Sequence, residues 1–156
     1  IVVACETVLD GVSKEYALRY ESCLDGGARA PAHGIPVDIA VAVGWLESRH
    51  HPAARSKAGA VGPLQVLPRY WCTNGVEAGC DLVGAGLRAL VRMKEKFGRD
   101  YLCHYNGGNR CRLRSKQYAY AVRSMARKIR HATKAACDKK YSLCCGEDMF
   151  YERYSE

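Results

Sequence analysis

Long hydrophobic runs, internal repeats and low-complexity tracts are all missing from this chain of 156 residues. The longest apolar stretch near the middle, residues 39–46, is far shorter than the roughly 20 residues that a membrane-spanning helix needs. The length corresponds to one domain, and 48% hydrophobic with 26% charged residues is sufficient for a buried core. We therefore expect a folded domain without a membrane span and exclude a disordered tail.

Metal-binding patterns are missing as well. None of the nine cysteines belongs to a Cys-x-x-Cys pair, which disfavours a zinc ribbon or a thioredoxin-type redox centre. No His-Glu-x-x-His motif occurs, and the side chains of the adjacent His50 and His51 diverge, so they do not easily share one metal ion. We expect no metal and no cofactor.

The high cysteine content favours disulfides, which form in oxidising compartments. This predicts an extracytoplasmic protein that is secreted, periplasmic or virion-associated. The chain starts at Ile1 rather than Met, so we expect a processed product or an excised domain.

Charge is unevenly distributed along the chain, whose net charge is +8. Residues 1–48 carry 3 basic and 7 acidic side chains, residues 49–135 carry 18 and 4, and residues 136–156 carry 3 and 5. The basic middle segment predicts an anionic partner, which could be nucleic acid, anionic lipid or an acidic wall polymer.

Apolar spacing predicts helices and no convincing pair of β-strands, so the expected fold is mainly α. We expect a compact helical domain over residues 1–136 and a Cys-rich C-terminal tail over residues 137–156 that packs on it or extends from it. The expected helices span residues 5–23, ended by Gly26 and Gly27; 36–49; 63–71; 81–97, with Asp81 as N-cap and Gly98 after the end; a short segment around Tyr101; and 113–136.

Glu47 is the candidate catalytic residue. It is the only carboxylate in residues 39–76, and it follows the most apolar helix in the chain. A carboxyl group at the end of a buried helix is desolvated, which raises its pKa and suits it to general acid catalysis at neutral pH. The alternative is an ordinary glutamate in an exposed last turn.

Four sequence blocks bear on this choice. They are Glu47-Ser48, the loop from Ser56 to Pro68 with its Gly-Ala-Val-Gly-Pro-Leu-Gln core, Tyr105-Asn106-Gly107-Gly108, and Tyr118-Ala-Tyr-Ala-Val122. Together, and in this order, they resemble the soluble lytic transglycosylase family (glycoside hydrolase family 23). The resemblance departs from the family at Pro63, which has no N–H to donate, at His104, and in the cysteines.

The resemblance implies a lysozyme-like fold and a peptidoglycan lytic transglycosylase. Ordinary glycosidases use two carboxylates, whereas residues 48–76 contain none. In such an enzyme Glu47 alone cleaves the β-1,4 bond between N-acetylmuramic acid and N-acetylglucosamine, and a 1,6-anhydro sugar forms without water. The implied partners are glycan strands, and a virion or secretion-system assembly is a further possible partner.

The resemblance also implies roles for other residues. Ser48 and Gln65 would hydrogen-bond the sugar or orient Glu47, and Tyr118 would hydrogen-bond Glu47. Tyr105 and Asn106 would line the floor of the site, with Asn106 reading acetamido groups.

Two other functions remain open. A goose-type lysozyme relative would hydrolyse the same bond, with Glu77, Asp81 or Asp100 positioning water. A basic binding module would instead hold nucleic acid or the wall on one helix face. That face carries Arg123, Arg127, Arg130 and Lys134. Specific nucleic-acid binding is disfavoured by the disulfide-level cysteine content. Cys103 and His104 could form a nucleophile pair, but nothing around them supports it.

Two disulfides are predicted from proximity in the sequence. Cys72 and Cys80 flank one turn-rich loop, and Cys103 and Cys111 flank another, so each pair can reach bonding distance. For Cys5 the partner stays open among Cys23, Cys137, Cys144 and Cys145. Because nine is odd, at least one thiol is free or pairs with another chain.

Overall fold

The computed structural model describes residues 1–140, and this part of the chain is helical without any strand. The expected mainly α fold is confirmed. The helices are α1 (Val2–Leu9), α2 (Tyr16–Arg29), α3 (Val37–Ser48), α4 (Pro68–Trp71), α5 (Leu82–Phe97), α6 (Tyr101–Gly107) and α7 (Leu113–Lys140), with short 3-10 turns at Pro31–His33, Thr73–Gly75 and Gly98–Asp100.

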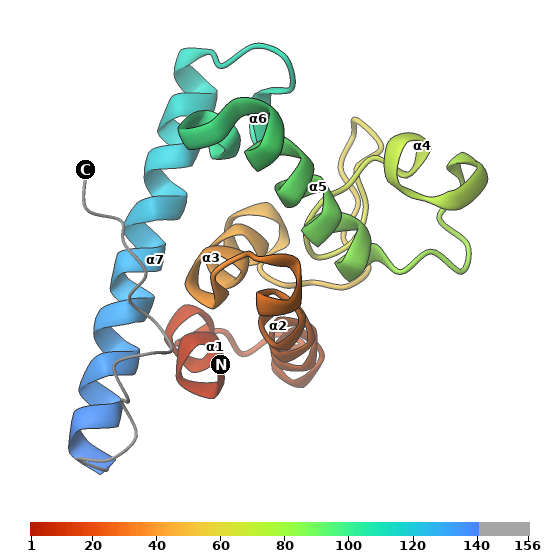
Figure 1. Cartoon of the computed structure of the whole chain (residues 1–156). Helices are drawn as coiled ribbons and strands as arrows, with labels where there is room; N and C mark the ends of the chain where they lie inside the picture. The colour runs from red at the N-terminus through yellow and green to blue at the C-terminus, as the bar shows by residue number, and fades with distance from the viewer. Residues whose placement is uncertain (141–156) are drawn as a thin grey trace.

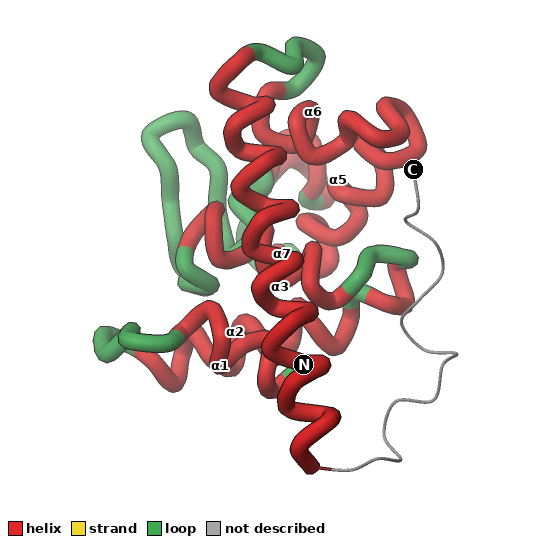
Figure 2. The backbone as a smooth tube through the Cα atoms, turned by 90° about the vertical axis from the view of Figure 1, so that its left-hand side faces the viewer, coloured by secondary structure: helices red, strands yellow, loops and turns green. Residues whose placement is uncertain are grey.

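The long helix α7 runs along one side of the molecule and is the element on which α1, α3 and α6 pack (Figure 1). Helix α3 crosses the middle of α7, and α2 lies against α3 (Figure 2). The loops around α4 project on the side away from α7 (Figure 1). The largest fully buried aliphatic side chains come from most of these helices: Leu9, Ile35, Val41, Val43, Leu87, Leu90, Leu102, Val122 and Ile129.

The predicted helix over residues 5–23 is wrong in its bounds, because two helices occupy this region. The chain turns between Leu9 and Tyr16, where Gly11 has a φ of +76° and Glu15 a φ of 55°. The expected stop at Gly26 and Gly27 is also wrong, since α2 continues to Arg29. Gly27 serves close packing instead: a Cβ there would lie 2.9 Å from Cγ2 of Ile1.

Two further boundaries differ from expectation. Helix α4 begins only at Pro68, because residues 61–66 form a bridged turn in which Val61 and Val66 exchange both backbone hydrogen bonds, at 2.8 and 3.0 Å. Helix α7 continues past Ala136 to Lys140, so the segment expected as a tail begins helically. Residues 141–156, the rest of that tail, lie outside the described residues.

The predicted N-cap is confirmed at α5, where the Asp81 carboxylate accepts a 3.0 Å hydrogen bond from the Gly84 N–H. Helix α3 also matches the expected segment to within a residue at each end. Within residues 1–140, no helix is both long and apolar enough to cross a membrane.

Three disulfides join pairs of cysteines that both lie in the described part of the chain. Both predicted local pairs are confirmed, Cys72–Cys80 and Cys103–Cys111, and Cys5 pairs with Cys23 to join α1 to α2. Cys144 and Cys145 lie outside the described residues. These bonds are compatible with an extracytoplasmic location.

Removing either local disulfide should destabilise the protein by a similar amount. Both bonds span 8 residues in sequence, so the chain-entropy model assigns each about 2–3 kcal/mol of unfolding free energy. We expect that loss in Cys72→Ser/Cys80→Ser and in Cys103→Ser/Cys111→Ser, measured by urea denaturation. Unchanged stability in both variants, or mapping of these cysteines as free thiols, would contradict the assignment.

Candidate active site

Helix α3 places Glu47 at its last turn. Residues Ala40 to Gly44 of this helix are buried, and its C-terminal turn, which includes Glu47 and Ser48, is half-buried. Burial raises the pKa of Glu47 to about 7, and a hydrogen bond from Tyr118 limits the rise. At neutral pH the side chain is therefore present in both its acid and its carboxylate form, as a residue that first donates and then accepts a proton requires.

Tyr118 of α7 holds the Glu47 carboxyl group. Its hydroxyl donates a 2.6 Å hydrogen bond to Oε1 of Glu47, so the contact implied by the family resemblance is present. Burial, together with the negative charge of Glu47, raises the pKa of Tyr118 well above its usual value, and Tyr118 remains a donor at all relevant pH values. Within residues 1–140, no side chain hydrogen-bonds the other carboxyl oxygen, Oε2.

The chain leaves α3 through two consecutive left-handed residues. Arg49 has a φ of 55° and His50 a φ of 60°, a conformation that costs about 1–2 kcal/mol for each non-glycine residue. Arg19 of α2 stabilises this left-handed turn, because its guanidinium donates to the carbonyl oxygens of Ser48 and Arg49 at 3.2 and 3.0 Å. The end of the helix that carries Glu47 is thus fixed by a residue nearly thirty positions earlier in the sequence.

His50 anchors the same turn from inside. Its side chain is buried against Gly44, where a Cβ would lie 2.6 Å from Nδ1, and Nε2 hydrogen-bonds the Val41 carbonyl at 2.9 Å. Burial lowers the pKa of His50 to about 4, so the ring is neutral. His51 points elsewhere, with Nε2 3.1 Å from a carboxylate oxygen of Glu15. The two histidines therefore diverge, as expected.

The loop that follows is braced by two of the candidate substrate residues. Oγ of Ser48 donates to the Pro63 carbonyl at 2.8 Å. Nε2 of Gln65 donates to the carbonyls of Gly62 and Ala54 at 2.9 and 3.2 Å. Ser48 thus joins the end of α3 to the 54–66 loop, and Gln65 closes that loop on itself. Pro63 has no N–H to donate, but this contact does not need one, because the Pro63 carbonyl group accepts the hydrogen bond.

Tyr105 and Asn106 come from α6 and have different surroundings. The Tyr105 hydroxyl donates to the Leu64 carbonyl at 2.6 Å, and the nearby Glu47 charge helps to raise the pKa of Tyr105. Asn106 is exposed and lines an open hollow of about 410 Å³ between α6 and α7. Tyr105 and Tyr118 are therefore brought to Glu47, while Asn106 faces solvent beside them.

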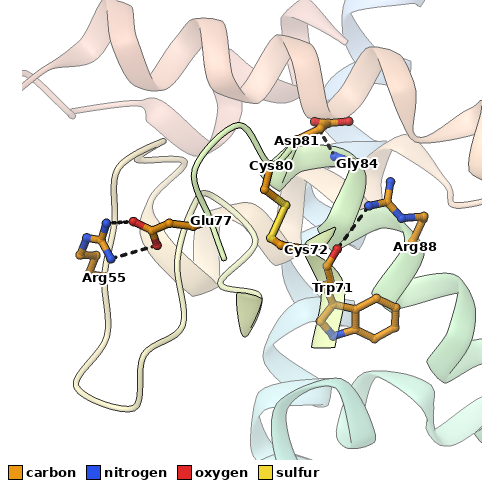
Figure 3. The surroundings of a disulfide bond; sticks show 8 residues. All are labelled: Arg55, Trp71, Cys72, Glu77, Cys80, Asp81, Gly84 and Arg88. Carbon is orange, nitrogen blue, oxygen red and sulfur yellow. Dashed lines mark hydrogen bonds and ion pairs between the residues drawn. A yellow bond between two sulfur atoms is a disulfide. The ribbon is translucent and has the colours of Figure 1, made fainter. Parts of the chain in front are cut away.

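The carboxylates considered for a hydrolytic mechanism have other partners. Glu77 pairs with Arg55 across the loops beside the Cys72–Cys80 disulfide, and Asp81 caps α5 (Figure 3). Asp81 also pairs with Arg29, which together with the cap lowers its pKa to about 2. Asp100 is exposed at the start of α6. Glu77 and Asp81 are thus each paired with an arginine.

The basic face of α7 is only partly available. Arg130 pairs with Asp38 of α3, and Arg123 donates to the Arg99 carbonyl at 2.5 Å, whereas Arg127 and Lys134 are exposed. Among residues 1–140, no group of three or more His, Cys, Asp or Glu side chains is placed to hold a metal ion.

The site therefore consists of one half-buried glutamic acid, a tyrosine that donates to it, and a loop held in place by Ser48, Gln65 and Tyr105. Such an arrangement can deliver and retrieve one proton at a fixed position. No protein-family model, curated protein or solved structure matches the chain.

Proposed function

We propose that this protein is a peptidoglycan lytic transglycosylase in which Glu47 is the single acid-base residue. The observation that carries the proposal is the setting of Glu47, a half-buried carboxyl group at the end of α3 that accepts a 2.6 Å hydrogen bond from Tyr118; this burial raises its pKa to about 7. The pairing of Glu77 with Arg55 supports it further, because that carboxylate is occupied.

The reaction needs one proton donor that later becomes a base. Protonated Glu47 gives its proton to the oxygen that joins C1 of N-acetylmuramic acid to the next sugar. The C1–O bond breaks, and that sugar leaves with a hydroxyl group. The Glu47 carboxylate then removes the proton from the C6 hydroxyl of the same N-acetylmuramic acid. The oxygen of that hydroxyl bonds to C1. Glu47 regains its proton, a 1,6-anhydro sugar forms, and no water is consumed.

The surrounding residues position these steps. Tyr118 keeps Oε1 occupied, so that proton transfer uses Oε2. Ser48, Gln65 and Tyr105 fix the loop that follows Glu47, because each donates a hydrogen bond to one of its backbone carbonyl groups. Asn106, with an exposed amide, is suited to bind an acetamido group of the glycan.

The partner and location follow from the same chemistry. A chain with a net charge of +8 is attracted to the anionic cell wall. Disulfides fit a secreted, periplasmic or virion-associated enzyme, and glycan strands are its proposed partner.

Tyr118→Phe should lower the turnover number by about 10-fold or more, because a hydrogen bond to a charged group contributes about 1.5–3 kcal/mol. The hydrogen bond lowers the pKa of Glu47, so its removal should also move the alkaline limb of the pH–rate profile to higher pH. Steady-state kinetics from pH 5 to pH 9 measure both effects. The matched control is Tyr120→Phe on the exposed face of the same helix, which should change neither quantity. An unchanged rate and profile in Tyr118→Phe would show that Tyr118 only packs.

Purified peptidoglycan provides the direct test of the proposal. The wild-type protein should release soluble fragments from a suspension of sacculi. The release is measured as a loss of turbidity. Failure to release fragments from sacculi that a muramidase dissolves would refute the proposed function.

A further inference from the structure

The open hollow beside Asn106 has three arginines and no acidic residue in its lining. Its walls come from the end of α6, the following turn and the first turn of α7, and it measures about 410 Å³. We call it the arginine pocket; its lining residues are Asn106, Gly107, Asn109, Arg110, Arg112, Arg114 and Ser115.

The arginines of this pocket have no acidic partner among residues 1–140. Arg110, Arg112 and Arg114 are all exposed, whereas other arginines, such as Arg29 and Arg130, pair with carboxylates. A fourth cation lies beside them, since Nζ of Lys96 is 3.4 Å from Oδ1 of Asn109. Guanidinium groups that are free of internal partners and converge on one hollow are suited to bidentate binding of an oxyanion.

A serine hydroxyl also opens onto the pocket. Ser115 is only 5% exposed and lines the hollow, and no residue of the described chain forms a side-chain hydrogen bond with it. Gly107 makes room for it, because a Cβ there would lie 3.0 Å from Cβ of Ser115. Its hydroxyl is accessible from the hollow and is therefore free to hydrogen-bond a ligand oxygen there.

The turn that carries the arginines is held rigidly. The Cys103–Cys111 disulfide closes it, and Nδ1 of His104 hydrogen-bonds the Gly108 carbonyl at 2.7 Å while its ring stacks on Phe97 with centroids 3.6 Å apart. A rigid turn loses little conformational entropy on binding, so the charges are arranged before a ligand arrives.

The pocket also lies near the proposed active site along the chain. Ser115 lies three residues before Tyr118 on α7, which corresponds to about 4.5 Å along the helix and nearly the same face. Asn106, a candidate glycan contact, forms part of the pocket wall. A substituent that branches from a strand held at Glu47 can therefore reach the arginines.

We propose that the arginine pocket binds a carboxylate carried by the peptide substituent of the glycan strand. This ligand assignment rests on the proposed function. The volume exceeds that of a single inorganic anion, so the pocket suits an anionic group attached to a larger substituent. In peptidoglycan that group is the acidic peptide on the lactyl ether of muramic acid. The pocket would thus favour peptide-bearing strands over strands whose carboxylates are masked.

Kinetics with matched substrates test this selectivity. The variants are Arg112→Gln/Arg114→Gln and the control Lys14→Gln/Lys128→Gln, which removes the same charge from exposed lysines elsewhere. The substrates are phosphate-free peptide-bearing strands, the same strands with carboxylates converted to carboxamides, and strands that retain phosphate polymers. We expect KM on the peptide-bearing strands to rise about 10- to 100-fold in the arginine variant, with kcat unchanged.

The other substrates separate the possible sources of the anion. On carboxamide strands the KM of the wild-type protein should rise by the same factor. The KM of the arginine variant should rise little further when the carboxylates are masked. An unchanged KM in the arginine variant, an equal rise in the lysine control, or an effect confined to phosphate-bearing strands would overturn the proposal.

A binding measurement separates this proposal from the proposed function. Wild-type protein and the arginine variant, each in a Glu47→Gln background, are titrated by calorimetry with a soluble muramyl peptide and with its carboxamide form. Loss of muramyl-peptide affinity in the arginine variant supports the pocket even if no strand is ever cleaved. Equal affinity in both proteins overturns the pocket, while cleavage by the wild-type protein leaves the proposed function standing.

Discussion

Glu47→Gln should reduce peptidoglycan cleavage by about 10³-fold or more, because a positioned acid-base residue contributes about 10²–10⁴-fold and in the proposed mechanism one residue performs both steps. Glutamine keeps the shape of the side chain and can still accept the hydrogen bond from Tyr118, but it cannot release and retrieve a proton. The measurement is the initial rate of fragment release from sacculi, together with a circular dichroism spectrum that shows an unchanged fold.

Matched carboxylate variants control for a hydrolytic mechanism. Glu77→Gln and Asp100→Asn each remove one of the three other candidate acids without touching Glu47, and both variants should retain nearly full activity. Substantial activity in purified Glu47→Gln would remove Glu47 from the mechanism. Loss of activity in Glu77→Gln or Asp100→Asn, with a stable fold, would favour the two-carboxylate alternative.

The second large effect is an opposite dependence of stability on pH at two buried groups. The pKa of Glu47 rises from 4.5 to about 7 on folding, so its contribution to stability is greatest at low pH and is lost as the pH increases between these values. The pKa of His50 falls from 6.5 to about 4, so its contribution is present above pH 6.5 and is lost as the pH decreases towards 4. Each change corresponds to about 3 kcal/mol.

In the wild-type protein the two pH-dependent contributions to the free energy of unfolding overlap between pH 4.5 and pH 6.5. They have opposite slopes there and nearly cancel. In Glu47→Gln only the His50 slope remains, so the free energy of unfolding should rise by about 2–3 kcal/mol from pH 4 to pH 6.5. At pH 8 this variant should be about 2–3 kcal/mol more stable than the wild type, because it no longer buries a carboxylate. Asp81, with a pKa of about 2, titrates below this window.

Urea denaturation with intact disulfides, repeated from pH 4 to pH 8, measures both curves. Parallel curves for wild type and Glu47→Gln would contradict the raised pKa of Glu47. A buried residue that lowers stability when it ionises is expected where a functional role competes with packing.

The helices that the sequence predicts best are those with local signals. Asp81 before an amphipathic run and Gly98 after it define α5, and the apolar run over residues 39–46 defines α3. The prediction failed where tertiary packing determines the backbone. Gly27 looked like a helix end, yet it remains helical because Ile1 packs where a side chain would be.

The same distinction applies to the site. Glu47 could be selected from its apolar setting and Tyr118 from the family resemblance, and the structure brings them within 2.6 Å. The roles of Arg19 and His50 could not be predicted, because they depend on contacts across α2, α3 and the following turn. A glycine within an otherwise apolar helix, Gly44, is the one signal that could have indicated a close neighbour.

The most direct test of a single acid-base glutamate is the fate of water at the new chain end. Peptidoglycan is digested in water labelled with oxygen-18, and the released muropeptides are analysed by mass spectrometry. A transglycosylase predicts 1,6-anhydro ends, one water lighter than reducing ends and free of label. Reducing ends that carry one oxygen-18 atom at C1 would show hydrolysis and contradict the mechanism proposed for Glu47.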